Sequence, residues 1–119
     1  MILVLRILFY VQLLLGAGRF MGLIRNERVW ETHFTLALVI AVLALVAFRG
    51  RAQEQAPGLV TAARLTPLLP LATGLAIFSG AAGGRSFVLL HILLALTSLS
   101  IIEMTSARLR KADASTKAG

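Results

Sequence analysis

Residues 87–104 read FVLLHILLALTSLSIIEM, and this stretch decides the fold. It contains one histidine, His91, and one charged residue, Glu103; the rest is apolar or carries a small hydroxyl group. A helix needs about 20 apolar residues, within a range of roughly 17–25, to cross the hydrocarbon core of a membrane. Because lipid offers no hydrogen bonds to the backbone, such a stretch has to be a helix. The sequence therefore predicts a transmembrane helix here.

Three further apolar blocks precede this stretch: Ile2 to about Ile24, Phe34 to Phe48, and Leu65 to Ala82. The second is long enough only if its helix begins near Trp30, an aromatic residue of the type found at membrane interfaces. We expect Pro67 and Pro70 to lie in the first turn of the third helix, where a missing amide donor is tolerated. The fold class predicted is an all-α integral membrane protein with a bundle of four transmembrane helices over residues 1–107.

The composition excludes several classes of protein. Of 119 residues, 58% are hydrophobic and 14% are charged, whereas soluble domains are roughly 45–50% apolar and about 25% charged. A soluble enzyme and a disordered chain are both excluded. The net charge is +7, but the basic residues lie between the apolar blocks, so we expect no nucleic-acid partner. The absence of cysteine excludes disulfides, thiolate metal sites and c-type haem attachment.

The distribution of Lys and Arg predicts the orientation in the membrane. With the N-terminus inside, the inner side holds Arg6, Arg49, Arg51, Arg64, Arg108, Arg110, Lys111 and Lys117, and the outer side holds Arg19, Arg25, Arg28 and Arg85. The excess of basic residues on the inner side predicts that both termini lie in the cytoplasm. We expect the membrane to be a bacterial-type inner membrane. Residues 108–119 are expected to form a polar, frayed cytoplasmic tail, anchored to anionic lipid by its basic residues.

The sequence matches itself at an offset of 58 residues. The matched residues are Arg6 with Arg64, Gly16 with Gly74, Phe20 with Phe78, Gly22 with Gly80, His33 with His91, and Leu36-Ala37-Leu38 with Leu94-Ala95-Leu96. The offset covers two helices, so it predicts a parallel two-helix repeat about an axis along the membrane normal. The only two histidines would then lie at equal depth on the second and fourth helices. A chance match in so apolar a chain is the alternative.

Two facing histidines in a helix bundle are typical of a cofactor site. His33 and His91 each lie roughly 4–6 Å inside the predicted outer end of their helix. Stripes of small residues follow them along the helix: Ala37, Ala41 and Ala44 after His33, and Ala95 and Ser98 after His91. These stripes leave room for a flat macrocycle, and we predict that both imidazoles bind the iron of a haem b. The outer arginines Arg19, Arg25, Arg28 and Arg85 would pair with the haem propionates.

Interpretations without a haem remain for the histidines and for the small residues that follow them. His33 could hydrogen-bond to Glu31 or Thr32, small stripes also serve close helix packing, and another pigment or ion could replace haem. Zinc is disfavoured because it would need a third protein ligand, for which only Glu27 or Glu31 is near. Gln12 could approach a cofactor or a quinone, or form a polar contact between helices. We expect Glu103 to pair with Arg108 or another basic residue.

Four helices with histidines on the second and fourth resemble one half of the haem A synthase family. The stretch Gly16-Ala-Gly-Arg-Phe-Met-Gly22, followed by Glu31 and His33, is similar to that family. The chain lacks the second half, the loop cysteines of many members, and the glutamate three positions before the first histidine. The resemblance therefore implies only that His33 and His91 bind haem. Small bis-histidine b-type membrane cytochromes, including the haem-bearing anchors of respiratory dehydrogenases, are similar at this level too.

The sequence thus predicts a small membrane subunit with one b-type haem, for electron transfer or haem support within a larger respiratory or photosynthetic complex. Its partners would be other membrane subunits, lipid and, as a further candidate, a quinone. With so little chain outside the membrane, we do not expect it to be an enzyme on its own. The alternative is a cofactor-free accessory subunit, and a second alternative is a carrier or quinone-binding module.

Overall fold

The computed structural model describes residues 1–50, 54 and 56–118, and its regular structure there is helical. The helices are α1 (Ile2–Phe20), α2 (Arg28–Ala47), α4 (Pro57–Leu65), α5 (Leu68–Phe78) and α6 (Arg85–Ala118). Arg51, assigned above to the inner side, lies outside the described residues.

Within the described residues, four helical stretches are long and apolar enough to cross a membrane. They are Ile2–Phe20, Arg28–Ala47, Pro57–Phe78 and Arg85–Lys117. The all-helical fold with four such stretches is therefore confirmed. The second block is long enough because its helix begins at Arg28, which places Trp30 in the first turn.

The third stretch differs from the sequence prediction. Its helix begins at Pro57, not near Leu65, and Pro67 lies at a break between α4 and α5. Proline has no N–H and its ring clashes with the carbonyl four residues earlier, so the helix cannot continue through it unbroken. At the break, the Ser98 hydroxyl of α6 donates to the Thr66 carbonyl over 2.9 Å. The Thr66 carbonyl, which has no amide partner at Pro70, also accepts from the Leu69 N–H over 3.1 Å. The Ser98 hydroxyl lies equally close to the Leu94 carbonyl, at 2.8 Å, so its proton is shared.

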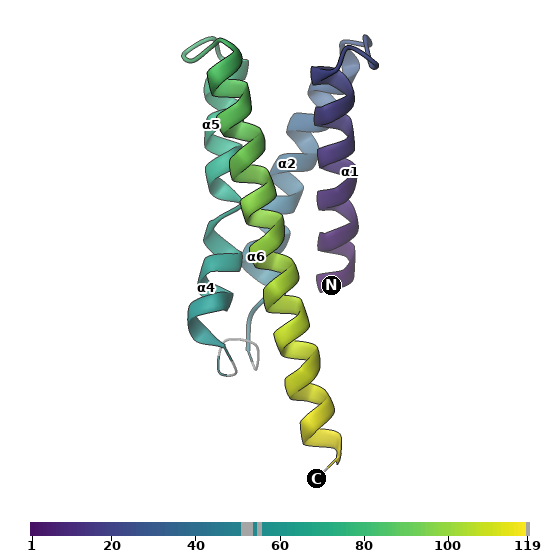
Figure 1. Ribbon diagram of the computed structural model, residues 1–119, viewed down its shortest axis with the longest axis vertical. Coiled ribbons are helices and arrows are strands. Elements are labelled where there is room, and N and C mark those ends of the chain that lie inside the picture. Colours follow the sequence, from purple (N-terminus) through teal and green to yellow (C-terminus); the bar gives the residue numbers. More distant parts are fainter. Residues whose placement is uncertain (51–53, 55, 119) are drawn as a thin grey trace.

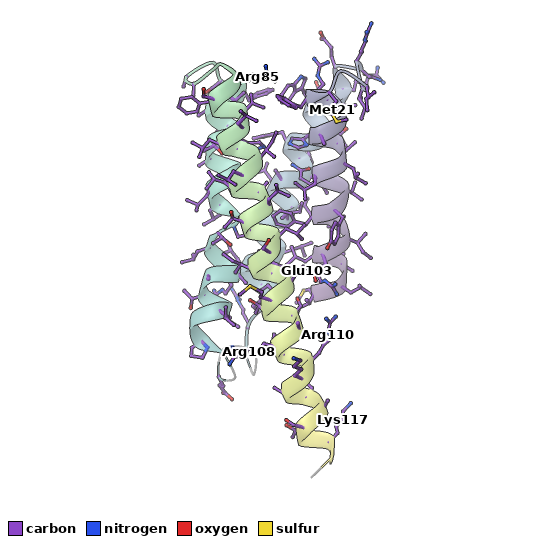
Figure 2. All side chains as sticks on the ribbon, in the orientation of Figure 1. Met21, Arg85, Glu103, Arg108, Arg110 and Lys117 are labelled. Carbon is purple, nitrogen blue, oxygen red and sulfur yellow. The ribbon has the colours of Figure 1, made fainter. Side chains whose placement is uncertain are left out.

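The C-terminal residues also differ from the prediction, because they are not a frayed tail. Helix α6 continues to Ala118 and projects beyond the other helices (Figure 1). Residues 107–117 are rich in Ala, Arg and Lys, which favour helix, and they extend a helix that already exists, so no new nucleation is needed. Figure 2 shows Arg108, Arg110 and Lys117 along this part of α6. No helix end marks the boundary predicted after residue 107.

The two halves of the chain share a direction and a turn geometry. Helices α1 and α2 run antiparallel, as do α4–α5 and α6, and both pairs start from the same end of the molecule (Figure 1). The bonds Met21 N to Ala17 O, Gly22 N to Arg19 O and Ile24 N to Gly18 O recur 58 residues later as Ser79 N to Leu75 O, Gly80 N to Ile77 O and Ala82 N to Ala76 O. Gly22 and Gly80 have φ angles of 73° and 75°, which glycine adopts without strain. The residues matched at this offset thus build the same turn.

The tightly packed core lies at one end of the molecule. Its buried residues are Leu5, Phe9, Ile40, Ala44, Phe48, Val60, Ala63, Leu99, Ile102 and Leu109. They come from the start of α1, the end of α2, α4, and the middle and second half of α6. Toward the other end the pair α1–α2 and the pair α5–α6 diverge (Figure 1). The two histidines matched by the sequence repeat, His33 and His91, lie toward this diverging end.

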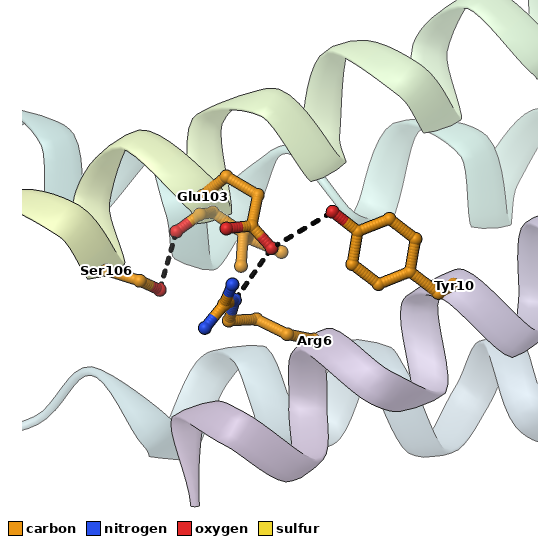
Figure 3. A network of polar contacts seen from close by, with 5 residues as sticks. Arg6, Tyr10, Glu103 and Ser106 are labelled. Atoms are coloured by element: carbon orange, nitrogen blue, oxygen red, sulfur yellow. Dashed lines mark hydrogen bonds and ion pairs between the residues drawn. The ribbon is translucent and has the colours of Figure 1, made fainter.

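An ion pair joins the two halves near the packed end (Figure 3). Arg6 Nε on α1 lies 2.6 Å from Glu103 Oε1 on α6. The Tyr10 hydroxyl donates to the same carboxylate oxygen over 3.3 Å. The basic partner of Glu103 is therefore Arg6, which is distant in sequence, and not the neighbouring Arg108.

Candidate functional site

The structure brings His33 of α2 and His91 of α6 together. Their ring centroids lie 6.2 Å apart and their planes are inclined by 57°. Both rings are partly buried and face the space between the diverging helix pairs. The two histidines are thus neighbours in the structure, as the repeat led us to expect.

Each histidine ring lies against a glycine of the preceding helix in its own half. A Cβ atom added to Gly16 would lie 3.0 Å from Cε1 of His33, and one added to Gly74 would lie 3.0 Å from Cε1 of His91. Any larger residue at either glycine would therefore push on the imidazole. The two glycines position the rings by close approach, a role that the sequence analysis did not assign although the offset had paired them.

A cavity of about 560 Å³ surrounds the two rings. Its size falls within the range of about 300–1,000 Å³ typical of small-molecule and cofactor sites. Among the described lining residues, ten pairs are related by 58 positions: Phe9/Pro67, Gln12/Pro70, Leu13/Leu71, Gly16/Gly74, Arg19/Ile77, Phe20/Phe78, Trp30/Val88, His33/His91, Phe34/Ile92 and Ala37/Ala95. The walls are mostly apolar, so the few polar groups determine what can bind.

The His91 ring is held by a hydroxyl group. Its Nδ1 lies 3.2 Å from Oγ1 of Thr73, which also lies 3.1 Å from the carbonyl oxygens of Leu69 and Pro70. The Thr73 hydroxyl has a single proton, so the direction of its bond to His91 depends on the tautomer of the ring. With the ring proton on Nδ1, the hydroxyl donates to a carbonyl, its oxygen accepts from Nδ1, and the lone pair of His91 is on Nε2. Thr73 could not be predicted from the repeat, because its counterpart is Leu15.

The surroundings of His33 are different. Gln12 Nε2 donates to the backbone carbonyl of His33 over 2.9 Å, so Gln12 both bridges two helices and lines the cavity. Gln12 Oε1 and His33 Nδ1 are buried without a hydrogen-bond partner among the described residues. The Trp30 ring meets the His33 ring edge-on at 6.5 Å. The hydroxyl of Thr32, an alternative partner for His33, donates to the Arg28 carbonyl instead.

Of the four arginines predicted to bind propionates, the structure places Arg19 at the cavity. Its guanidinium lies 5.7 Å from the centre of the Trp30 ring and donates to the Ile24 carbonyl over 3.3 Å. The other three, Arg25, Arg28 and Arg85, are exposed and are not among the residues that line the cavity. Arg85 lies at the diverging end of the molecule (Figure 2).

The small-residue stripes divide between two roles. Ala37 and Ala95 line the cavity, whereas Ala41, Ala44 and Ser98 are buried. The stripes thus have two roles: part of each lines the cavity, and part allows close packing of the helices, which was the alternative interpretation of the sequence. Between the halves, the rings of Phe34 and Phe78 stack at 5.7 Å.

The donor set limits which metals fit. Across the described residues, no group of three or more His, Asp or Glu side chains could hold a metal ion. A structural zinc ion, which takes four ligands, does not fit two imidazoles alone. Iron in a macrocycle fits better, because its remaining ligands come from the macrocycle. Comparisons with protein-family models, curated proteins and solved structures find no match to this chain.

Proposed function

We propose that this chain is a membrane-spanning subunit that holds one b-type haem between His33 and His91. Its role would be electron transfer or haem support within a larger respiratory or photosynthetic complex, as in the small b-type cytochromes it resembles. The observation that carries the proposal is the paired imidazoles, each against a glycine, in an apolar cavity.

The exposed side chains support membrane insertion. Leu14, Leu23 and Leu93 are 72%, 74% and 61% exposed, and they are three of many large apolar residues on the outside. So extensive an apolar surface is unfavourable in water and suits lipid or a partner subunit. The excess of basic residues at the end that holds the N-terminus supports a cytoplasmic location for both termini.

The separation of the rings supports a shared iron. Two imidazoles that would bind one metal through bonds of about 2 Å have ring centres at most roughly 6 Å apart. The 6.2 Å between His33 and His91 is close to this limit.

The residues around the rings have separable roles. Gly16 and Gly74 allow α1 and α5 to approach the imidazoles and fix their direction. The walls are mostly apolar, and Arg19 offers a charge-assisted hydrogen bond to a carboxylate at the cavity edge. A bound haem would supply one-electron chemistry, and this chain would tune it through its ligands, charge and burial.

Titration with haem tests the proposal. The full-length chain, purified in detergent, should bind one haem and give a low-spin spectrum. His33→Ala and His91→Ala should each abolish that low-spin spectrum. The matched controls are Thr32→Ala and Thr97→Ala, exposed positions on the same two helices, and both should bind haem normally. A folded wild-type chain that gives no haem spectrum would refute the proposal and favour a cofactor-free accessory subunit.

A further inference from the structure

The two histidines have matching glycine neighbours but unlike partners on their ring nitrogens. Thr73, whose Oγ1 lies 3.2 Å from Nδ1 of His91, has Leu15 as its counterpart in the other half. Gln12, which binds the backbone of His33, has Pro70 as its counterpart. The ligand pair is therefore symmetric in position and asymmetric in hydrogen bonding.

On the second half, the hydrogen bonds prepare one ligand. The Thr73 hydroxyl lies 3.1 Å from the carbonyl oxygens of Leu69 and Pro70 and 3.2 Å from Nδ1 of His91. A histidine whose other nitrogen donates to a fixed oxygen keeps its tautomer and direction and is a more basic ligand. If the hydroxyl proton goes to a carbonyl, the Thr73 oxygen accepts from Nδ1 and His91 presents Nε2 without a proton shift.

On the first half, no such partner fixes the ring. Among the described residues, His33 Nδ1 is buried without a partner, and so is the amide oxygen of Gln12. The Gln12 amide is tied by its nitrogen to the His33 carbonyl. Gly16, Trp30 and the facing His91 ring contact the His33 ring, but none of them gives its Nδ1 a hydrogen bond. In the part of the chain that the structure describes, no hydrogen bond to Nδ1 selects a tautomer of His33 or would support it as a metal ligand.

We propose that Thr73 is a positioning residue that accepts the Nδ1 proton of His91 and makes His91 the more firmly held imidazole of the pair, with His33 the less firmly held one. This inference rests on the proposed haem function. It adds that a haem bound here would be held mainly through His91, and that a small iron ligand would compete with His33.

The haem-free chain provides the first test. Nitrogen-15 NMR of both histidines in micelles should show one tautomer for His91, with the proton on Nδ1, and a mixture for His33. Thr73→Val should convert His91 to a mixture, and Thr73→Ser should restore the single tautomer. Thr97→Val, an exposed change on α6, is the control. Equal tautomer ratios for the two histidines would overturn the inference, whether or not the chain binds haem.

The haem-loaded chain provides the second test, with carbon monoxide as the probe. His33→Ala should keep haem through His91 and bind carbon monoxide readily, whereas His91→Ala should lose haem affinity by roughly 10–100-fold more than His33→Ala does. Thr73→Val should reduce the difference between the two variants. Equal losses, or a larger loss in His33→Ala, would overturn the inference and leave the haem proposal standing. Failure of the wild type to bind haem would overturn both.

Discussion

Gly74 on α5 lies so close to His91 on α6 that a Cβ atom on the glycine would be 3.0 Å from Cε1 of the imidazole. The same distance separates the corresponding position on Gly16 from His33. Two helix pairs therefore hold their histidines by the same close contact. The residues matched by the sequence repeat thus make the same contact in both halves of the candidate site.

The first prediction concerns these glycines. Gly16→Ala and Gly74→Ala should each displace an imidazole, because overpacking of this kind costs about 1–3 kcal/mol. We expect haem affinity to fall roughly tenfold or more in either variant, measured by titration. Gly58→Ala is the matched control, since Gly58 also lies in a helix and a methyl group there meets open space. Wild-type affinity in both cavity variants would contradict the role assigned to the glycines.

The second prediction concerns charge at the cavity. Removal of the Arg19 cation should favour oxidised haem, which carries one more positive charge, and should lower its midpoint potential. Arg19→Gln should retain haem with a potential lower by tens of millivolts, up to about 60 mV for a tenfold effect. Potentiometric titration measures this shift. Arg85→Gln should change the potential less, because Arg85 is exposed and does not line the cavity; a larger shift in Arg85→Gln would refute the assignment.

The third prediction concerns the ion pair between the halves. Both side chains are about three-quarters buried, yet the contact with solvent weakens their attraction. We expect Glu103→Gln to lower the Tm in detergent by roughly 5 °C, which corresponds to about 1 kcal/mol in a chain of this size. The exchange Arg6→Glu with Glu103→Arg should recover most of the loss. If the exchange is no more stable than Glu103→Gln, the pair does not join the halves as described.

The fourth prediction concerns the break in the third helical stretch. Ser98→Ala removes the hydroxyl that donates to the Thr66 carbonyl. Because this carbonyl keeps the Leu69 N–H, the loss should cost about 0.5–1.5 kcal/mol. The Tm should fall accordingly. Ser100→Ala, on the exposed side of the same helix, removes a hydroxyl bonded only within α6 and should change the Tm little. Equal effects of the two substitutions would show that the break needs no support from α6.

Much of this fold could be predicted from the sequence, because long apolar blocks leave little choice of structure. The paired histidines were also accessible, since His33 and His91 stand at the same offset as Gly16 and Gly74. The start of α4 at Pro57 was missed because residues 57–64 are only mildly apolar, and helix in this segment depends on packing of Val60 and Ala63 into the core.

The polar partners of the site could not be predicted. Thr73 gives no signal in the sequence, because many exposed threonines in membrane helices bond only to their own backbone, as Thr97 does. Which oxygen lies beside Nδ1 of His91 depends on how α5 restarts after the break at Pro67. The pairing of Arg6 with Glu103 likewise depends on the packing of α1 against α6, which no local pattern encodes.

The central claim is tested most directly by a reduced-minus-oxidised visible spectrum of the full-length chain, purified in detergent from membranes supplied with haem. We predict the sharp bands of a low-spin b-type cytochrome, lost in His33→Ala and His91→Ala and kept in Thr32→Ala. A folded wild-type chain with a featureless spectrum, or bands that survive both histidine substitutions, would contradict it.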